Sequence, residues 1–407
     1  MKRFLLAFAA ATMGSALAYC ETPLTAQSGT YKATDLVIGE GDWVFQNQPS
    51  LQDFRMDYSI TPDSLKALAS ISAGLKKGGT QLVMVLPPTK GLLEWQHLAV
   101  NAPILERFKP ETALKSYEAT IAALNGAGIL APNLYTAMKQ DASDPFLRQD
   151  PHWSPSGAAK AAEAVAALIK AQPDFQLPQD PAFQPIQRSD ITVKTGVATP
   201  FKSLTVAAVQ AICGESPLQS FAPVSSEAGG LLGDPEITVV GTSFSGNPIF
   251  PFVPHLSELL GVDVGNAALS SGGYQNSILQ YLEYARKQAP VKYLIWEMPG
   301  WYGYNNIPIH RQVLPAVRGG CETKGAEVGD ALPIAPRARQ YLYLKFPGET
   351  VEVNLAVDLG GKTEQTKLTR LPGLGAQEYF WQLDANTTSV SVTTPNNKPF
   401  QYGLCPL

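Results

Sequence analysis

The sequence is poor in the residues that build metal centres. It holds only four cysteines and four histidines in 407 residues, and no two cysteines form a CxxC pair. Without such a pair or a histidine and cysteine cluster, we expect neither a metal site nor another cofactor. The scarcity of histidine also leaves few candidates for any mechanism that needs an imidazole, namely His97, His152, His255 and His310.

Charge of either sign is modest. Lys and Arg number 31 against 35 Asp and Glu, which gives a formal net charge of −4. This balance creates no broad basic field, so nucleic acid is not expected as a partner, and an anionic polymer would need a local basic strip. The chain is 45% hydrophobic and 16% charged, which is ordinary for a globular protein of more than one domain.

The beginning of the chain is typical of a secretory signal. Met1-Lys-Arg is basic, an apolar stretch follows, and Ala16-Leu-Ala18 supplies small residues before a cleavage site. The apolar stretch is shorter than the roughly 20 residues that a membrane-spanning helix needs, which favours a signal over a retained anchor. We therefore expect cleavage after Ala18, a periplasmic protein, and no role in the fold for residues 1–18.

All four cysteines remain after that cleavage. An even number of cysteines in an oxidising compartment predicts two structural disulfides. The sequence leaves three pairings open. The spacing favours Cys321–Cys405, which would enclose the C-terminal segment, and Cys20–Cys213, which would clamp the N-terminus.

Helical and short apolar segments alternate from about residue 60. Helical spacing of apolar residues predicts helices near 65–75, 110–125, 157–171 and 277–288. Short apolar runs predict buried strands at 81–86, 237–240, 262–264 and 293–296. This alternation predicts an α/β domain over residues 19–325, a parallel sheet flanked by helices, with its ligands at the carboxyl ends of the strands.

The character of the sequence changes near residue 331. Short β-rich runs at 341–346, 351–355 and 389–392 alternate in polarity and are separated by Gly, Asn and Pro. Such runs with frequent turns are typical of a small β-sandwich or barrel. We therefore predict a second domain, a β-sandwich, over residues 326–407.

The segment Asp150-Pro-His152-Trp contains the first catalytic candidates. In an extended segment, residues i and i+2 project to the same side, so Asp150 can accept the Nδ1 proton of His152 and leave Nε2 free as a base. A solvated or capping aspartate beside a core histidine is the competing interpretation. The position of the pair just before the helix start at Ser154 leaves both interpretations open, and a serine nucleophile elsewhere in the chain would favour the catalytic one.

A nucleophile is predicted at the end of the strand 237–240. Gly241 permits a tight turn there, and Ser243 would present its hydroxyl at the edge of the sheet. Ser245 is the competing choice, and a serine that only caps the next helix is the structural alternative. Ser243 lies nearer the strand end, where backbone N–H groups are free to bind an oxyanion.

An oxyanion hole needs further donors close to the developing negative charge. The Ser243 N–H is one candidate, and Gly273 in the loop 270–273 is a second. Asn276 is a candidate side-chain donor, although it would equally serve as a helix cap. Tyr302 follows the last strand at the same edge, where it would hold substrate, donate to the oxyanion or simply pack.

Four segments resemble the alginate O-acetyltransferase family, the AlgX and AlgJ group of SGNH-hydrolase-like proteins. They are GEGDWVF at 39–45, DPHWSPSG at 150–157, GTSFS at 241–245 and IWEMP at 295–299, and they follow in family order. The histidine precedes the serine, so the resemblance implies a permuted SGNH-hydrolase-like fold. It also implies that Ser243 is the nucleophile, His152 the base and Asp150 the carboxylate that orients it.

The β-rich tail resembles the carbohydrate-binding module of the AlgX type. By this resemblance Lys367 and Arg370, in the stretch 367–371, would grip an acidic polysaccharide such as alginate. The implied activity is O-acetylation of an exported polysaccharide through an acetyl-serine. The implied partners are the polysaccharide chain, a membrane acyl-transfer protein and periplasmic export proteins. A polysaccharide acetyl esterase with the same triad and a non-catalytic glycan-binding scaffold are the alternatives.

Overall fold

The computed structural model describes residues 36–41, 43–48, 51–140, 144–148, 150–173, 175, 188–194, 218–225, 235–335 and 339–407. The predicted signal, residues 1–18, and the predicted Cys20–Cys213 disulfide lie outside these residues. None of the helices within them is both long and apolar enough to cross a membrane.

A four-stranded parallel sheet forms the centre of the first part of the chain. Its strands are β4 (Gln81–Val85), β9 (Tyr293–Glu297), β7 (Ile237–Val240) and β8 (Val264–Asn266), in that spatial order. Every residue of β7 and β9 is buried. Continuous apolar strands of this kind are stable only when both faces of the sheet are covered.

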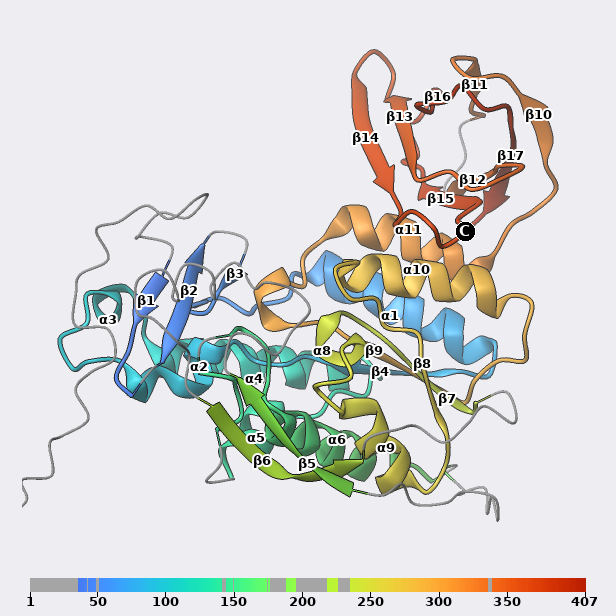
Figure 1. Ribbon diagram of the computed structural model, residues 1–407. Helices are drawn as coiled ribbons and strands as arrows, with labels where there is room; N and C mark the ends of the chain where they lie inside the picture. Colours follow the sequence, from blue (N-terminus) through green and yellow to red (C-terminus); the bar gives the residue numbers. More distant parts are fainter. Residues whose placement is uncertain are drawn as a thin grey trace, which may run out of the picture.

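Helices cover both faces of this sheet (Figure 1). One face carries α1 (Pro62–Lys77), α10 (Gly273–Ala285) and α11 (Ile307–Arg318). The other carries α5 (Leu134–Lys139), α6 (Pro155–Lys170) and α9 (Phe252–Leu260). The predicted parallel sheet flanked by helices is therefore confirmed.

Capping residues explain where two of the longest predicted helices begin. Thr61 accepts a hydrogen bond from the Ser64 N–H ahead of α1, and Ser154 accepts one from the Gly157 N–H ahead of α6. Each cap is followed by a proline at the first helical position, where a missing N–H costs nothing. The remaining helix of comparable length, α4 (Pro110–Gly126), contacts α1 and the short α2 (Lys90–Glu94).

Several short elements complete this part of the chain. Three antiparallel strands, β1 (Leu36–Ile38), β2 (Val44–Gln48) and β3 (Leu51–Gln52), form a small separate sheet. Two more, β5 (Arg188–Lys194) and β6 (Leu218–Ser225), pair with each other. The short helices are α3 (Ile104–Arg107), α8 (Ser243–Gly246), η2 (Trp95–His97) and η3 (Gly300–Tyr302).

The C-terminal strands form two antiparallel four-stranded sheets. The first has the order β10 (Lys324–Ala326), β17 (Phe400–Pro406), β12 (Gln340–Lys345) and β15 (Glu378–Gln382). The second has the order β11 (Ala331–Pro333), β16 (Ser389–Thr393), β13 (Glu352–Asp358) and β14 (Thr363–Thr369). Inward-facing residues of both sheets, among them Leu342, Val353 and Val390, share one core. The predicted β-sandwich is confirmed.

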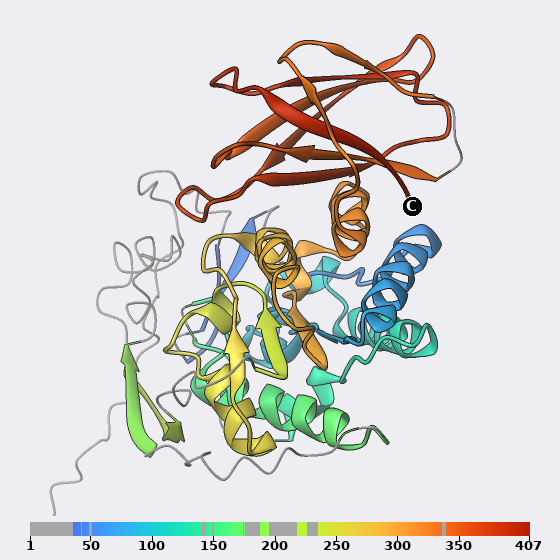
Figure 2. The same cartoon turned by 90° about the vertical axis from the view of Figure 1, so that its right-hand side faces the viewer.

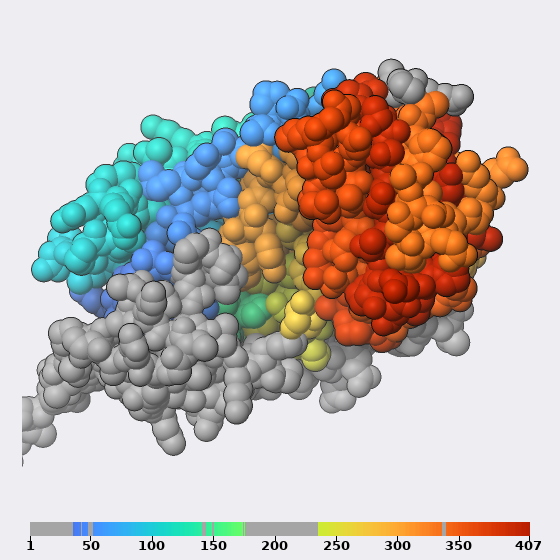
Figure 3. Space-filling view, turned by 90° about the horizontal axis from the view of Figure 1, so that it is seen from above, coloured from blue at the N-terminus to red at the C-terminus, as the bar shows by residue number. Residues whose placement is uncertain are grey.

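The sandwich lies against α10 and α11 (Figure 2), and from above it forms a distinct lobe (Figure 3). Its first sheet contributes Tyr341, Tyr343 and Phe380 to the hydrophobic core of the α/β part. The Tyr341 hydroxyl also donates to the Gly319 carbonyl at 2.7 Å. The two parts are therefore joined by a shared apolar seam rather than by a linker alone.

A disulfide reinforces this seam. Cys321, just after α11, is bonded to Cys405 in β17, with 5.7 Å between the two Cα atoms. This pairing is the one that the cysteine spacing favoured, and it is confirmed. The predicted domain boundary between residues 325 and 326 falls inside β10, which pairs with β17.

Two predicted elements are displaced by a few residues. Helix α10 begins at Gly273 rather than 277 and ends at Ala285 rather than 288. Strand β8 covers 264–266 rather than 262–264, because Gly261 ends α9 in the left-handed conformation, with φ of 70°, and the chain needs two further residues to reach the sheet.

Candidate active site

Strand β7 delivers Ser243 to the carboxyl edge of the sheet. The strand ends at Val240, and Gly241 and Thr242 make the turn into α8, whose first residue is Ser243. Thr242 is the N-cap, because its hydroxyl accepts from the Phe244 N–H. The Ser243 side chain is partly exposed, whereas those of its neighbours Thr242 and Phe244 are buried. The turn therefore presents one hydroxyl toward solvent.

His152 reaches this hydroxyl from the loop that precedes α6. The loop is fixed by two backbone hydrogen bonds, from Leu147 N–H to the His152 carbonyl and from Ser154 N–H to the Pro145 carbonyl. Trp153 adds a third tie, since its indole N–H donates to the Phe244 carbonyl at 2.9 Å. The loop before α6 is thus attached directly to the turn that carries Ser243.

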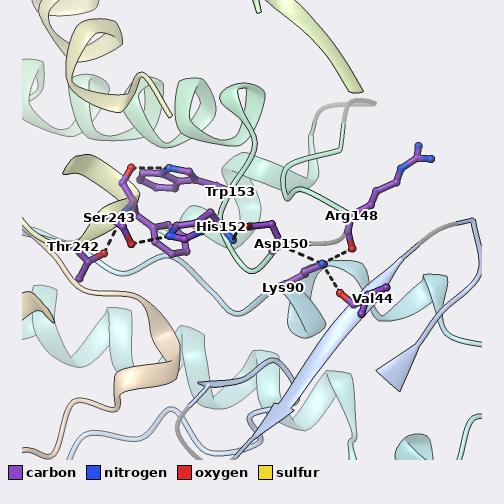
Figure 4. A network of polar contacts seen from close by, with 9 residues as sticks. Val44, Lys90, Arg148, Asp150, His152, Trp153, Thr242 and Ser243 are labelled. Atoms are coloured by element: carbon purple, nitrogen blue, oxygen red, sulfur yellow. Dashed lines mark hydrogen bonds and ion pairs between the residues drawn. The ribbon is translucent and has the colours of Figure 1, made fainter. Parts of the chain in front are cut away.

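The structure brings Asp150, His152 and Ser243 into one chain of hydrogen bonds (Figure 4). The distance from His152 Nε2 to Ser243 Oγ is 2.7 Å, and the distance from His152 Nδ1 to Asp150 Oδ1 is 2.6 Å. The same Asp150 oxygen accepts the His152 backbone N–H at 2.9 Å. With Nδ1 protonated and held by the carboxylate, Nε2 is available to take the Ser243 proton.

Asp150 and His152 are buried, and aromatic rings surround the imidazole. Asp150 is 1% exposed and His152 is 9% exposed. Phe250 stacks on the imidazole at 5.0 Å and Phe244 lies 4.8 Å from it. Burial alone would raise the pKa of Asp150, but the adjacent His152 holds it below its usual value. Asp150 is therefore ionised when it orients the imidazole.

A fully buried glutamate lies beneath the nucleophile turn. Glu297, the last residue of β9, accepts the Thr242 N–H at 2.7 Å and the hydroxyls of Thr242 and Ser245. Burial raises the pKa of Glu297 to about 7. Ser245, the competing nucleophile in the sequence, therefore points its hydroxyl at a carboxylate, and no hydrogen bond joins it to His152 within the described part of the chain.

A buried lysine holds the loop that carries Asp150. Lys90, the first residue of α2, donates through Nζ to the carbonyls of Val44 and Arg148 at 2.6 Å and to that of Asp150 at 3.3 Å (Figure 4). Burial lowers the pKa of Lys90 to about 8, although the carboxylates of Asp53 and Asp150 oppose this. The ammonium thus ties β2 to the loop that carries Asp150.

Lys90 is expected to be required for stability. Lys90→Met keeps the apolar stem but leaves the carbonyls of Val44, Arg148 and Asp150 without this donor, and it removes the positive charge that interacts with the buried Asp53. Leaving a buried hydrogen-bonding group without its partner typically costs about 1–3 kcal/mol, so the free energy of unfolding in urea is expected to fall by about that amount. Lys66→Met, an exposed change on α1, is the control. Equal midpoints for the two variants would contradict the role given to Lys90.

Of the predicted oxyanion donors, the Ser243 N–H lies at the turn, whereas Gly273 and Asn276 belong to α10. The Ser243 N–H has no acceptor among the described residues, so it is free to bind an oxyanion. The loop after β8 brings Leu269 rather than Gly273 against the turn, since the Leu269 N–H donates to the Gly241 carbonyl at 3.0 Å. Gly273 is instead the first residue of α10, with φ of 64°. The Asn276 amide donates to the Gly272 carbonyl, so it braces the start of α10.

Aromatic side chains lie beside the nucleophile, on η3 after β9. Trp301 packs edge-on against Phe244 at 5.0 Å. Tyr302 is 40% exposed, its ring lies 5.1 Å from that of Tyr274, and burial raises the pKa of its hydroxyl. Figure 3 shows the segment near residue 300 at the surface between the N-terminal part and the C-terminal lobe. Tyr302 is therefore open to solvent.

The two predicted polymer-binding residues of the stretch 367–371 are placed differently from one another. Lys367 is exposed and pairs with Glu352 at 2.6 Å. Arg370 is only 6% exposed, donates to Gln312 of α11 at 3.2 Å and stacks on the Tyr379 ring at 4.7 Å. A guanidinium buried in the seam cannot reach a polymer in solvent, so the predicted role of Arg370 is corrected to a structural one.

No group of three or more His, Cys, Asp or Glu side chains in the described part of the chain is placed to hold a metal ion. A serine hydroxyl, an oriented imidazole and a free backbone N–H are the groups needed to attack a carbonyl carbon and to stabilise the oxyanion that forms.

Sequence reasoning missed Glu297 and Lys90. Glu297 did carry a signal, since it is a carboxylate that directly continues an otherwise apolar buried strand, at the edge where ligands gather. Lys90 carried none, because a lysine near a helix start is ordinarily exposed and only the tertiary fold surrounds it with carbonyls.

Known proteins resemble this chain in both sequence and fold. A family model described as SGNH hydrolase-like domain, acetyltransferase AlgX, matches residues 36–300. The alginate biosynthesis protein AlgX of Pseudomonas fluorescens is 31% identical over 379 residues, which are 89% of this chain and 74% of that protein. The probable alginate O-acetylase AlgJ of Pseudomonas syringae pv. tomato is 29% identical over 288 residues, 68% of this chain and 70% of that protein.

The solved structure of Pseudomonas aeruginosa AlgX superposes with a TM-score of 0.70 at 26% identity and covers 91% of this chain and 94% of that one. Together with the family match, this similarity extends over the α/β part and the C-terminal sandwich. The resemblance and the fold class drawn from the four sequence segments are confirmed, and the chain belongs to the AlgX family of SGNH-hydrolase-like acetyltransferases.

Proposed function

We propose that this protein transfers acetyl groups to the hydroxyls of an exported polysaccharide, alginate or a similar chain, in the periplasm. The observation that carries the proposal is the 2.7 Å contact between His152 Nε2 and Ser243 Oγ, in line with the 2.6 Å contact between His152 Nδ1 and Asp150. The names of the relatives, an alginate biosynthesis protein and a probable alginate O-acetylase, support the substrate class.

The first half-reaction loads the enzyme. His152 takes the Ser243 proton at Nε2 while Ser243 Oγ forms a bond to the acetyl carbonyl carbon of the donor. The resulting oxyanion is stabilised by the free Ser243 N–H. As the oxyanion collapses, the bond to the donor breaks, and His152 returns the proton to the leaving group. Acetyl-Ser243 remains.

The second half-reaction unloads it. A sugar hydroxyl gives its proton to His152 and attacks the acetyl carbon, the bond to Ser243 Oγ breaks, and Ser243 takes the proton back from His152. Water competes for the same intermediate. A hydroxyl held in line gains a large effective concentration over diffusing water, so polymer positioning decides between transfer and hydrolysis.

We also propose which residues contact the polysaccharide and which proteins take part in acetyl transfer. The exposed Tyr302 on η3 and the exposed Lys367 on the C-terminal sandwich are proposed to contact the polysaccharide. The donor side is proposed to involve a membrane acyl-transfer protein and periplasmic export proteins, as the family resemblance implies.

The decisive measurement separates transfer from hydrolysis. The purified protein is incubated with para-nitrophenyl acetate and with deacetylated mannuronate oligosaccharides, and the sugars are examined by mass spectrometry. We expect acetylated oligosaccharide and a decrease in free acetate as the acceptor concentration rises. Free acetate alone, at a rate independent of the acceptor, would show a polysaccharide esterase instead.

A further inference from the structure

We infer that Glu297 is a positioning residue that acts through its negative charge, holding the Thr242–Ser243 turn in register with His152 during acyl transfer. This inference rests on the proposed function, because it assigns Glu297 a task in the reaction of Ser243. Glu297 does not touch the hydroxyl that reacts; it acts on the residues on either side of it.

The contacts of Glu297 surround the nucleophile along the chain. Its Oε2 accepts the Thr242 N–H at 2.7 Å and the Ser245 hydroxyl at 3.2 Å. Its Oε1 accepts the Thr242 hydroxyl at 3.0 Å. The carboxylate thus fixes the residue before Ser243 and the residue two positions after it. Because all of these groups donate, the arrangement suits an ionised carboxylate, which only accepts.

The turn approaches Glu297 very closely at Gly241. A Cβ on Gly241 would lie 2.5 Å from Glu297 Oε2, so only glycine allows the chain to approach the carboxylate this closely. The Gly241 N–H is also held, by the Ser277 hydroxyl at 2.8 Å, and that hydroxyl donates to the Ala267 carbonyl. The close approach is therefore a built feature of the turn.

Burying the charge of Glu297 lowers the stability of the fold, which indicates that the charge has a functional role. The side chain is 0% exposed, and no Lys or Arg forms a salt bridge with it in the described part of the chain. The titratable groups that interact with it are His152 and Tyr302. A buried charge without a cation weakens the fold, and such costs gather at functional sites.

The reaction itself supplies the missing cation. When His152 takes the Ser243 proton it becomes an imidazolium, and the electrostatic interaction with Glu297 then turns attractive. The Glu297 charge is thus compensated in the transition state and not in the resting enzyme. An interaction that strengthens only there raises the rate rather than the affinity.

Glu297→Gln separates this role from a structural one. The substitution keeps the shape and the acceptor for the Thr242 N–H but removes the charge. We expect kcat for para-nitrophenyl acetate to fall about 10- to 100-fold with little change in KM, as for a slightly misplaced nucleophile. The urea midpoint is expected to stay equal or to rise, because a buried unpaired charge is removed.

The pH dependence gives the sharper test. Wild-type Glu297 becomes neutral as pH falls below its pKa of about 7, whereas glutamine is neutral throughout. The wild-type kcat/KM divided by that of the variant is therefore expected to fall toward 1 as the pH is lowered from about 8.5 to about 5.5. A purely structural role predicts a ratio that is constant with pH.

Three companion variants make each outcome decisive. Glu378→Gln, which removes a carboxylate on β15 far along the chain from the turn, should leave the rate unchanged. If Glu297→Gln does not fold, Thr242→Val, which removes the hydroxyl that donates to Glu297 and caps α8, must lower kcat. Ser243→Ala is measured in parallel. If this variant keeps wild-type activity, the proposed function itself is wrong. If Ser243→Ala loses activity but the ratio of wild-type to Glu297→Gln kcat/KM does not change with pH, only the inference about Glu297 is wrong.

Discussion

Ser243→Ala is expected to lower kcat/KM for para-nitrophenyl acetate by about 10⁴- to 10⁶-fold, the range seen when a serine nucleophile is removed from a triad. The change deletes one partly exposed hydroxyl whose hydrogen-bond partner is His152. Folding stability should therefore remain nearly unchanged. Steady-state kinetics and urea unfolding of the two proteins measure both quantities.

The acetyl-enzyme provides an independent readout of the same change. Wild-type protein mixed with para-nitrophenyl acetate should carry one acetyl group on Ser243, as seen by peptide mass spectrometry, and Ser243→Ala should carry none at this turn. Ser245→Ala is the matched control, and it should still be acetylated on Ser243, with a smaller loss of rate. Ester turnover that survives in folded Ser243→Ala would favour the glycan-binding scaffold.

Asp150→Asn is expected to reduce kcat/KM by about 10⁴-fold. Asp150 Oδ1 accepts from both the Nδ1 and the backbone N–H of His152, at 2.6 and 2.9 Å. An amide carries no charge to stabilise the imidazolium, and its NH₂ group, when it faces Nδ1, favours the tautomer with the proton on Nε2. In that tautomer His152 cannot take the Ser243 proton.

Asp144→Asn is the control for this substitution. Asp144 precedes Asp150 in the same loop but pairs with Arg148 at a more exposed position, at 2.8 Å. Its conversion should change kcat/KM less than about threefold, since exposed ion pairs contribute little. A loss of less than about tenfold for Asp150→Asn would remove Asp150 from the mechanism.

Most of the framework was predictable because it depends on local and periodic signals. Apolar runs at 81–86, 237–240 and 293–296 became three strands of the sheet, and the Thr-Pro and Ser-Pro starts became capped helices. The sequence also named the three residues that the structure brings together. A carboxylate two residues before a histidine, and a serine just after a strand, need only the rule that catalytic groups gather at the carboxyl edge.

The rest depends on contacts between segments far apart in sequence. Lys90 and Arg370 look like ordinary surface cations in the chain, and both are buried only because distant carbonyls and rings enclose them. Gly273 lies in the loop that the sequence selected, yet the start of α10 takes it into a helix and Leu269 meets the turn instead. Periodicity gives no information about such placements.

The strand order of the central sheet bears on which truncations of the chain can still complete that sheet. Strand β9 lies between β4 and β7, and it is the last of the four to leave the ribosome. A chain that ends before residue 293 contains Asp150, His152 and Ser243 but lacks the strand that pairs with both β4 and β7. We therefore expect a fragment that lacks β9 to leave the central sheet unpaired in its middle and to be inactive toward acetyl esters.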